Sequence, residues 1–189
     1  MLERVKAAQT QEPRALPGFR DWYRDYFQFV WRSARRLGVA PAELDDVVQD
    51  VFMVVHRQLS DYEPRHSPRA WLFAITRRVA ADHRRSRRRK GGLLPLYEEA
   101  VRGQGGDPLR EAMNKERSDV ILEFLASVDD ERREVFILFE LEQLTAPEIA
   151  DAVQANLSTV YSRVRLARQA FSAFVQNQYP ELMGDDTHG

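Results

Sequence analysis

Residues 144–171, LTAPEIADAVQANLSTVYSRVRLARQAF, contain two amphipathic helical segments joined by a short turn. Thr145 and Glu148 match a capping box, which predicts a helix that opens here and ends near Val153. A longer helix is predicted to begin near Ser158. The pattern therefore favours a helix-turn-helix, whose expected core is apolar and consists of Leu144, Ile149, Ala150, Val153, Leu157, Val160 and Val164.

The outward side of the second helix carries hydroxyl, aromatic and arginine side chains. Residues near the N-terminal end of such a helix meet base edges, and later arginines meet phosphates. A plain helical hairpin with a basic face remains the alternative interpretation, and Gln154 stands where the turn usually has glycine. The candidate DNA contacts are Ser158, Thr159, Tyr161, Ser162, Arg163, Arg165 and Arg168.

A second basic segment, residues 76–90, holds eight lysines and arginines against one acid, Asp82. The whole chain is nearly neutral, with a formal net charge of −1, so the positive charge is concentrated rather than general. Clustered cations repel one another, and phosphate contact accounts for them better than a solvated face does. Residues 98–134 carry the opposite excess, which indicates an acidic surface with another role.

The distribution of glycine, proline and apolar residues predicts an all-α chain of two small helical domains joined by a flexible linker. We found no sustained alternation of period two, so no sheet is expected. The predicted boundaries are a disordered lead at 1–18, a first domain at 19–90, a linker at 91–112, a second domain at 113–175 and a tail at 176–189.

The predicted helix at 42–59 has two contrasting faces. One face is apolar, with Leu44, Val47, Val48, Val51, Phe52, Val55 and Leu59 at helical spacing. The opposite face is polar apart from a single methionine, and its members are Asp46, Gln49, Asp50, Met53 and Arg57. A solvated face with one stray methionine and a partner-docking patch are both compatible with this pattern.

A short polar loop, residues 60–66, follows this helix. The next helix begins at Ser67 and Pro68, a cap followed by proline at the first helical position. The loop carries aromatic, imidazole and charged groups that could hold an unstacked base, although an ordinary connector would have the same composition.

Several classes of function are excluded or disfavoured. The chain has no cysteine, which excludes disulfides and cysteine-ligated zinc and fits the reducing cytoplasm. Its four histidines show no metal-ligand spacing, and no set of carboxylates converges in a known catalytic pattern. We therefore expect no enzyme activity, no metal, no cofactor and no small-molecule substrate. We also expect no signal peptide and no membrane span.

Taken together, these segments resemble a bacterial sigma factor of the extracytoplasmic-function (group 4) type, which has only sigma regions 2 and 4. Residues 45–52, DDVVQDVF, are similar to the D-x-V-Q-E-V-F signature of region 2. Residues 69–72 followed by Ile75 are similar to the segment that leads into the −10-reading helix. Residues 148–150 and 158–164 are similar to the recognition motif of region 4.

The resemblance implies a role for each surface. Asp46, Gln49, Asp50, Met53 and Arg57 would dock on the clamp helices of the largest subunit of core RNA polymerase. The second-domain helix would read the −35 element of promoter DNA, and an anti-sigma factor would be a further partner. The −10 element would be opened and held by the loop and the helix that follows it, through Asp61, Tyr62, Arg65, His66, Trp71, Arg77, Arg78, Arg84, Arg85, Arg87 and Arg88.

The sequence departs from the family pattern at two of these positions. Arg78 stands where such sigma factors often have asparagine, and Tyr161 stands where they often have a basic residue. Both differences affect the promoter sequence that would be read. Two alternative functions are a sigma mimic that titrates an anti-sigma factor, which would not need the basic residues, and a simple repressor, which would leave the first domain unexplained.

Overall fold

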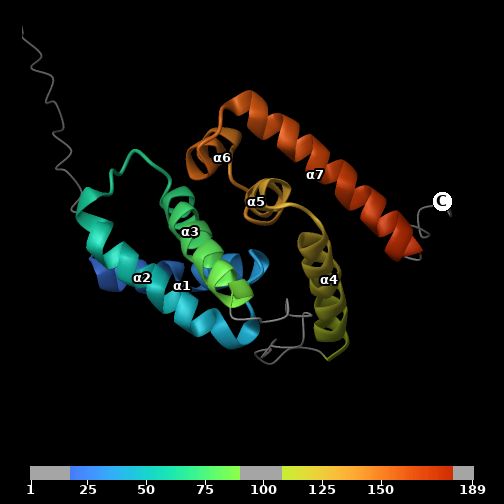
Figure 1. Ribbon diagram of the computed structural model, residues 1–189, viewed down its shortest axis with the longest axis horizontal. Coiled ribbons are helices and arrows are strands. Elements are labelled where there is room, and N and C mark those ends of the chain that lie inside the picture. Colours follow the sequence, from blue (N-terminus) through green and yellow to red (C-terminus); the bar gives the residue numbers. More distant parts are fainter. Residues whose placement is uncertain (1–17, 90–107, 181–189) are drawn as a thin grey trace, which may run out of the picture.

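The computed structural model describes residues 18–89 and 108–180. Residues 1–17 of the predicted lead, 91–107 of the predicted linker and 181–189 of the predicted tail lie outside these ranges. Within both ranges the regular structure is entirely helical, with no strand, which confirms the predicted all-α class (Figure 1). No helix in the two described ranges combines the length and apolar character that crossing a bilayer requires.

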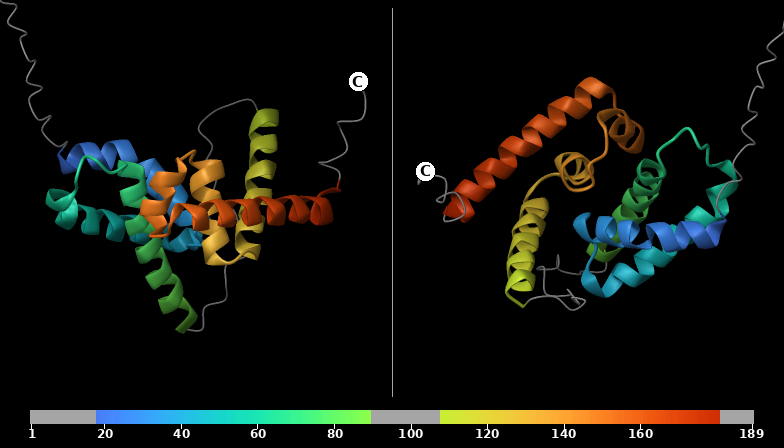
Figure 2. Two further views of the ribbon diagram at one scale, coloured as in Figure 1. Left: turned by 90° about the horizontal axis from the view of Figure 1, so that it is seen from above. Right: turned by 180° about the vertical axis from the view of Figure 1, so that it is seen from behind.

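Three helices build the first domain: α1 (Phe19–Arg36), α2 (Leu44–Gln58) and α3 (Pro68–Arg89). Single 3₁₀ turns, Pro41–Glu43 and Leu59–Asp61, flank α2. Each helix contacts the other two, so their apolar stripes close on one another (Figure 2). The predicted stripe of α2 is buried from Leu44 to Val55, whereas Leu59 lies at the edge and is half-buried.

Gly38 ends α1 with a left-handed turn. Its φ is +86°, its N–H donates to the carbonyl of Arg35, and the N–H of Val39 donates to the carbonyl of Ala34. These two bonds form a Schellman motif, which satisfies the last carbonyls of the helix. A residue with a Cβ atom adopts this backbone region at a cost of about 1–2 kcal/mol.

We therefore expect Gly38→Ala to lower the free energy of unfolding by about 1–2 kcal/mol, because alanine is strained at this φ. Steric overlap is not the cause, since an added Cβ would lie 3.7 Å from the nearest Arg84 atoms. Urea denaturation measures the effect. Gly38→Asn is the matched control, because asparagine tolerates the left-handed region better than alanine does. Equal destabilisation by the two substitutions would contradict the assignment.

The second domain contains α4 (Pro108–Ser127), α5 (Asp130–Phe136), α6 (Ala146–Val153) and α7 (Leu157–Gln178), with a π-helical turn at Ile137–Leu141 between α5 and α6. The helix α4 begins within the segment predicted as linker, and α7 continues into the predicted tail. Proline suits the first position of a helix because its fixed φ is helical and its missing N–H is not needed there. This explains why α4 can begin at Pro108.

Local hydrogen bonds place the two helices of the helix-turn-helix. The N–H of Thr145 donates to Oε2 of Glu148 at 2.8 Å, which confirms the capping box. The N–H of Thr159 donates to Oδ1 of Asn156 at 2.8 Å and caps α7. Gln154 takes the left-handed conformation of the turn, with φ of 54°. The predicted turn is therefore present, and glutamine occupies the left-handed position that usually has glycine.

One predicted core residue of this motif is exposed. The side chain of Leu157 is 45% exposed, whereas Ile149, Val160 and Val164 are buried as predicted. Leu157 occupies the first position of α7, where the chain has just left the turn and no helix packs over it. The prediction was wrong because helical periodicity gives the direction of a side chain but not where the covering helix ends.

Phenylalanines dominate the core of the second domain. The ring of Phe124 is fully buried, and its centroid lies 4.9 Å from that of Phe136, 5.0 Å from that of Phe171 and 5.7 Å from that of Phe174. These rings join α4, α5 and α7. Edge-to-face contacts of this kind stabilise a core beyond the area they bury.

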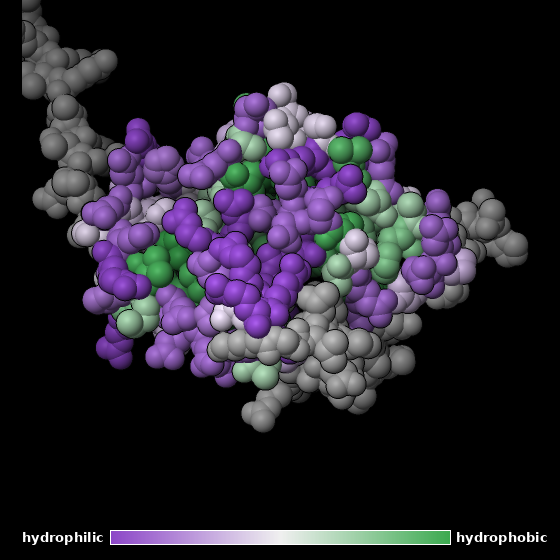
Figure 3. All heavy atoms as spheres, in the orientation of Figure 1, coloured by the Kyte–Doolittle hydropathy of each residue, from purple (hydrophilic) through white to green (hydrophobic). Residues whose placement is uncertain are grey.

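The two domains pack against each other, which the sequence did not predict. Helix α6 contacts α3, and α7 leads away from this contact (Figure 1). The buried apolar residues of both domains form one continuous cluster. On the face shown in Figure 3, hydrophilic side chains gather over the C-terminal half of α3, with a hydrophobic area over α1 and α2 to one side.

Candidate nucleic-acid and partner interfaces

The polar face of α2 is exposed in full. All five predicted docking residues, Asp46, Gln49, Asp50, Met53 and Arg57, are exposed. Met53 is 55% exposed and is the large apolar side chain on this otherwise polar face. The Nε of Arg57 donates to the carbonyl of Met53 at 3.2 Å, so the arginine stem runs back along the helix next to the methionine.

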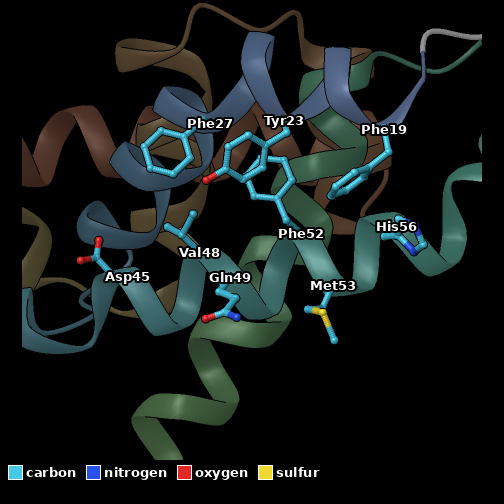
Figure 4. A pocket seen from close by; sticks show the side chains of 9 residues that line it. All are labelled: Phe19, Tyr23, Phe27, Asp45, Val48, Gln49, Phe52, Met53 and His56. Atoms are coloured by element: carbon cyan, nitrogen blue, oxygen red, sulfur yellow. The ribbon is translucent and has the colours of Figure 1, made fainter.

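An aromatic groove of about 640 Å³ lies beside this face, between α1 and α2 (Figure 4). Phe19, Tyr23 and Phe27 of α1 line one side, and Phe52 and Met53 of α2 belong to the other. Sequence reasoning missed the contribution of α1, because these residues appear only as one apolar stripe of a helix. The 44% exposure of Tyr23 shows that this stripe is not wholly used in the core.

Asp50 also contacts the next helix. Its Oδ2 lies 2.8 Å from Nε2 of His83 on α3. This contact fixes the carboxylate at the border between the docking face of α2 and the basic end of α3. The predicted docking and −10 surfaces are therefore neighbours, joined through one side-chain pair.

Tyr62 is buried, although its loop was predicted to hold a base. Its side chain is 6% exposed and its hydroxyl donates to the carbonyl of His66 at 2.6 Å. Its ring packs against Trp22 and Trp71, with centroid distances of 4.8 and 5.1 Å. In this conformation Tyr62 supports the loop from inside and offers no face to a base. The other predicted contacts in the loop, Asp61, Arg65 and His66, are exposed.

Most predicted −10 arginines of α3 are already paired with carboxylates. Arg84 donates through two nitrogens to Asp130 of α5, both at 3.1 Å, and Arg77 donates to Oε2 of Glu134 at 3.0 Å. Within the first domain Arg85 pairs with Asp82, and Arg87 lies 3.6 Å from Glu43. Arg78 and Arg88 are exposed, with no ion-pair partner among the described residues.

Burial changes the pKa of one acid at this contact between the domains. Glu134 is 8% exposed, and desolvation raises the pKa of its carboxyl above the usual range, while Arg77 opposes the shift. The arginine favours the charged form of the carboxyl and so offsets part of the cost of its burial. The ion pair between Arg77 on α3 and Glu134 on α5 is therefore largely buried, unlike an ion pair between exposed side chains.

Glu142 makes the most buried polar contact between the domains. Its side chain is only 2% exposed and it pairs with Arg36 of α1 and Arg69 of α3, with Arg32 at 3.5 Å. The guanidinium of Arg69 also lies 5.0 Å from the ring centroid of Phe29. Sequence reasoning missed Glu142, and no local pattern marks it. The acidic excess at 98–134 did signal the other acids of the contact, Asp130 and Glu134.

A second groove, of about 760 Å³, lies where α3 meets α6. Trp71 and Arg78 line its first-domain side, and Ala150, Asp151 and Gln154 line the other. Trp71 is half-buried there. The predicted base-reading part of α3 consequently faces the second domain in this arrangement.

The predicted DNA-reading side of α7 is open. Ser158, Ser162 and Arg165 are exposed, and Tyr161 is 59% exposed. Two other predicted contacts are held by neighbouring acids: Arg163 lies 2.6 Å from Glu131, and Arg168 lies 2.6 Å from Glu140. Thr159 is half-buried beside its cap.

Each of the two domains matches a known protein family. Sigma-70 region 2 matches residues 22–90, and sigma-70 region 4 matches residues 118–171. The RNA polymerase sigma factor NccH of Alcaligenes xylosoxydans xylosoxydans is 30% identical over 77% of this chain and 80% of that protein. The ECF RNA polymerase sigma factor SigK of Mycobacterium sp. (strain KMS) is 30% identical over 72% of each chain.

The fold is shared with a solved structure of the sigma factor RpoE in complex with the anti-sigma factor NepR from Bartonella quintana. The TM-score is 0.68 at 19% identity, covering 85% of this chain and 98% of that one. With two helical domains of the sigma-70 type in the expected order, the chain belongs to the extracytoplasmic-function family of RNA polymerase sigma factors, which are non-catalytic subunits that direct transcription initiation.

Proposed function

We propose that this sigma factor uses three separate surfaces to start transcription. The exposed face of α2 docks on the clamp helices of core RNA polymerase. The loop at 60–67 and α3 open and hold the −10 element, and α7 reads the −35 element. The observation that carries this proposal is the exposure of Met53 beside an aromatic groove, because an adaptable apolar side chain next to an apolar hollow suits a protein-docking surface.

The basic residues favour a DNA-binding sigma factor over a mimic. Arg78 and Arg88 on α3 and Arg165 on α7 are exposed, and a protein that only titrates an anti-sigma factor would not need them. A simple repressor would need α7 but would leave the face of α2 without a use. Tyr62 is reassigned in this proposal from base contact to support of the loop, since it is buried.

An anti-sigma factor is a further proposed partner. The sigma factor RpoE, which shares this fold, was solved in complex with an anti-sigma factor, NepR. The grooves between α1 and α2 and between α3 and α6 are the concave surfaces that an inhibitor could occupy. The proposed location is the cytoplasm, where core polymerase and promoter DNA are found.

The deciding experiment mixes the purified protein with sigma-free core polymerase and maps transcripts from pooled genomic DNA. New start sites that share two upstream motifs are the expected result, and they would supply the promoter consensus. Binding to core without transcripts would favour the mimic. Absence of core binding would contradict the docking assignment and favour the repressor.

A further inference from the structure

Helix α7 exposes two large apolar side chains near its N-terminal end, outside the core. Tyr161 is 59% exposed and Leu157 is 45% exposed, while Val160, Val164 and Ala167 make the buried contacts of the helix. Residues four apart on a helix are neighbours on its surface. Leu157 and Tyr161 therefore form one apolar patch over the first turns of α7.

The position of this patch matches the part of the helix that approaches base edges. In a helix-turn-helix, the N-terminal residues of the second helix meet the bases in the major groove. The apolar feature of the major groove is the 5-methyl group of thymine. Exposed hydroxyls at Ser158 and Ser162 and the cation of Arg165 lie along the same helix and suit polar and phosphate contacts.

We propose that Leu157 and Tyr161 select a thymine in the −35 element by enclosing its methyl group. This inference rests on the proposed function of α7 as the −35 reader and adds the base that it prefers. The polar groups would set the register of the helix on the duplex, and the apolar patch would discriminate between bases. Cytosine and uracil present no methyl group at this position, so they would be bound less well.

Replacing thymine by uracil tests the proposal, since the two bases differ only by the methyl group. A −35 duplex from a mapped promoter is prepared with each thymine replaced in turn, and its affinity for the full-length protein is measured. At one or two positions we expect a loss of about fourfold, the value of one buried methyl group. Tyr161→Ala and Leu157→Ala should bind the thymine and uracil duplexes equally.

Leu166→Ala is the matched control, because Leu166 lies on the same helix, is 37% exposed and is outside the patch. It should keep the preference for thymine. If the wild-type protein binds the −35 duplex but shows no preference at any position, the methyl-reading role is overturned and the proposed function stands. If no −35 duplex is bound above a random sequence, both are overturned.

A different observation, the contact between the domains, carries a second inference. The carboxylates of Asp130 and Glu134 pair with Arg84 and Arg77, and Glu142 pairs with Arg69. Helix α6 meanwhile forms one side of the groove whose other side Trp71 and Arg78 line. The second domain thus covers part of the surface of α3 that is proposed to bind the −10 strand.

A hydrogen that a guanidinium group donates to a carboxylate is not available to a phosphate, and the paired carboxylate also neutralises the charge that would attract one. We infer that the packed arrangement of the domains and −10 strand binding exclude each other, with the acids of α5 and Glu142 acting as an internal substitute for DNA phosphates. This inference also rests on the proposed function of α3. Separation of the domains would then precede promoter opening.

The test reverses the charge of the most buried acid. In Glu142→Lys, an ammonium group would face Arg36 and Arg69, so the domains should separate. We expect a larger radius of gyration by small-angle X-ray scattering and roughly tenfold tighter binding of a single-stranded −10 oligonucleotide, as for the loss of one charged contact. Transcription with core polymerase should be retained.

The added positive charge alone could strengthen DNA binding, so a control must carry it too. Asp25→Lys makes the same change of charge on α1, where Asp25 is 52% exposed and pairs only with neighbouring Arg24 among the described residues. This variant should keep the wild-type radius of gyration. The inference is overturned if Glu142→Lys stays compact, or if it expands but gains no more affinity than Asp25→Lys does.

Discussion

Replacing Met53 by aspartate is expected to reduce affinity for core RNA polymerase by roughly 30- to 150-fold, or about 2–3 kcal/mol. Met53 is the large apolar side chain in the middle of the exposed face of α2, next to the groove that Phe52 and Tyr23 line (Figure 4). A carboxylate at this position would lose its hydration when the apolar contact with the polymerase forms, and this desolvation would weaken binding. Titration of fluorescently labelled protein with core polymerase measures the change.

The control for this prediction is Met53→Leu, which keeps the volume and apolar character of the side chain and should bind core within a factor of a few. Binding of isolated −35 DNA should be the same in both variants, since α7 is not involved. Wild-type affinity of Met53→Asp for core would show that the polymerase docks elsewhere. It would leave the −35 assignment of α7 intact.

Replacing Phe124 by alanine is expected to destabilise the second domain by about 3–5 kcal/mol, which is much of the stability of a small domain. Phe124 is fully buried and its ring contacts connect α4 to α5 and α7. Loss of these contacts should abolish binding of −35 DNA. Docking on core polymerase through α2 should remain, because that face belongs to the first domain.

The reciprocal variant is Phe73→Ala, which empties an equally buried site on α3. It should impair polymerase binding and keep −35 binding. Circular dichroism melting and the two binding assays together check both variants. If either substitution removes both activities, the domains do not fold independently, and the single apolar cluster that spans them would be the reason.

Much of the fold could be predicted because its signals are local. The capping box at Thr145 and Glu148, the two faces of α2 and the proline start of α3 all depend on residues within one or two helical turns. Hydrophobic periodicity likewise identified the buried side of α2 and most of the buried residues of α6 and α7. The error at Leu157 arose where this rule needs a partner helix, since exposure depends on what packs over a residue.

The candidate sites divide in the same way. Exposure of Met53, Arg165 and Tyr161 follows from helical phase, and the structure places them outside as expected. Burial of Tyr62 does not follow from phase, because its loop is polar and only the approach of Trp22 and Trp71 from two other helices encloses the ring. The three aromatic residues lie on separate segments, and no local pattern links them.

The sequence by itself determined the helical class, the family and the exposed faces of α2 and α7, because each depends on the order and spacing of nearby residues. Only the tertiary structure decided that Glu142 meets Arg36 and Arg69 and that α6 covers part of α3. Ion pairs between distant segments depend on how whole helices pack, and many arrangements of the same charges would suit the sequence equally well. The physical reason is that an ion pair forms only where the fold brings two charged side chains close together, and the order of the residues does not specify which distant segments meet.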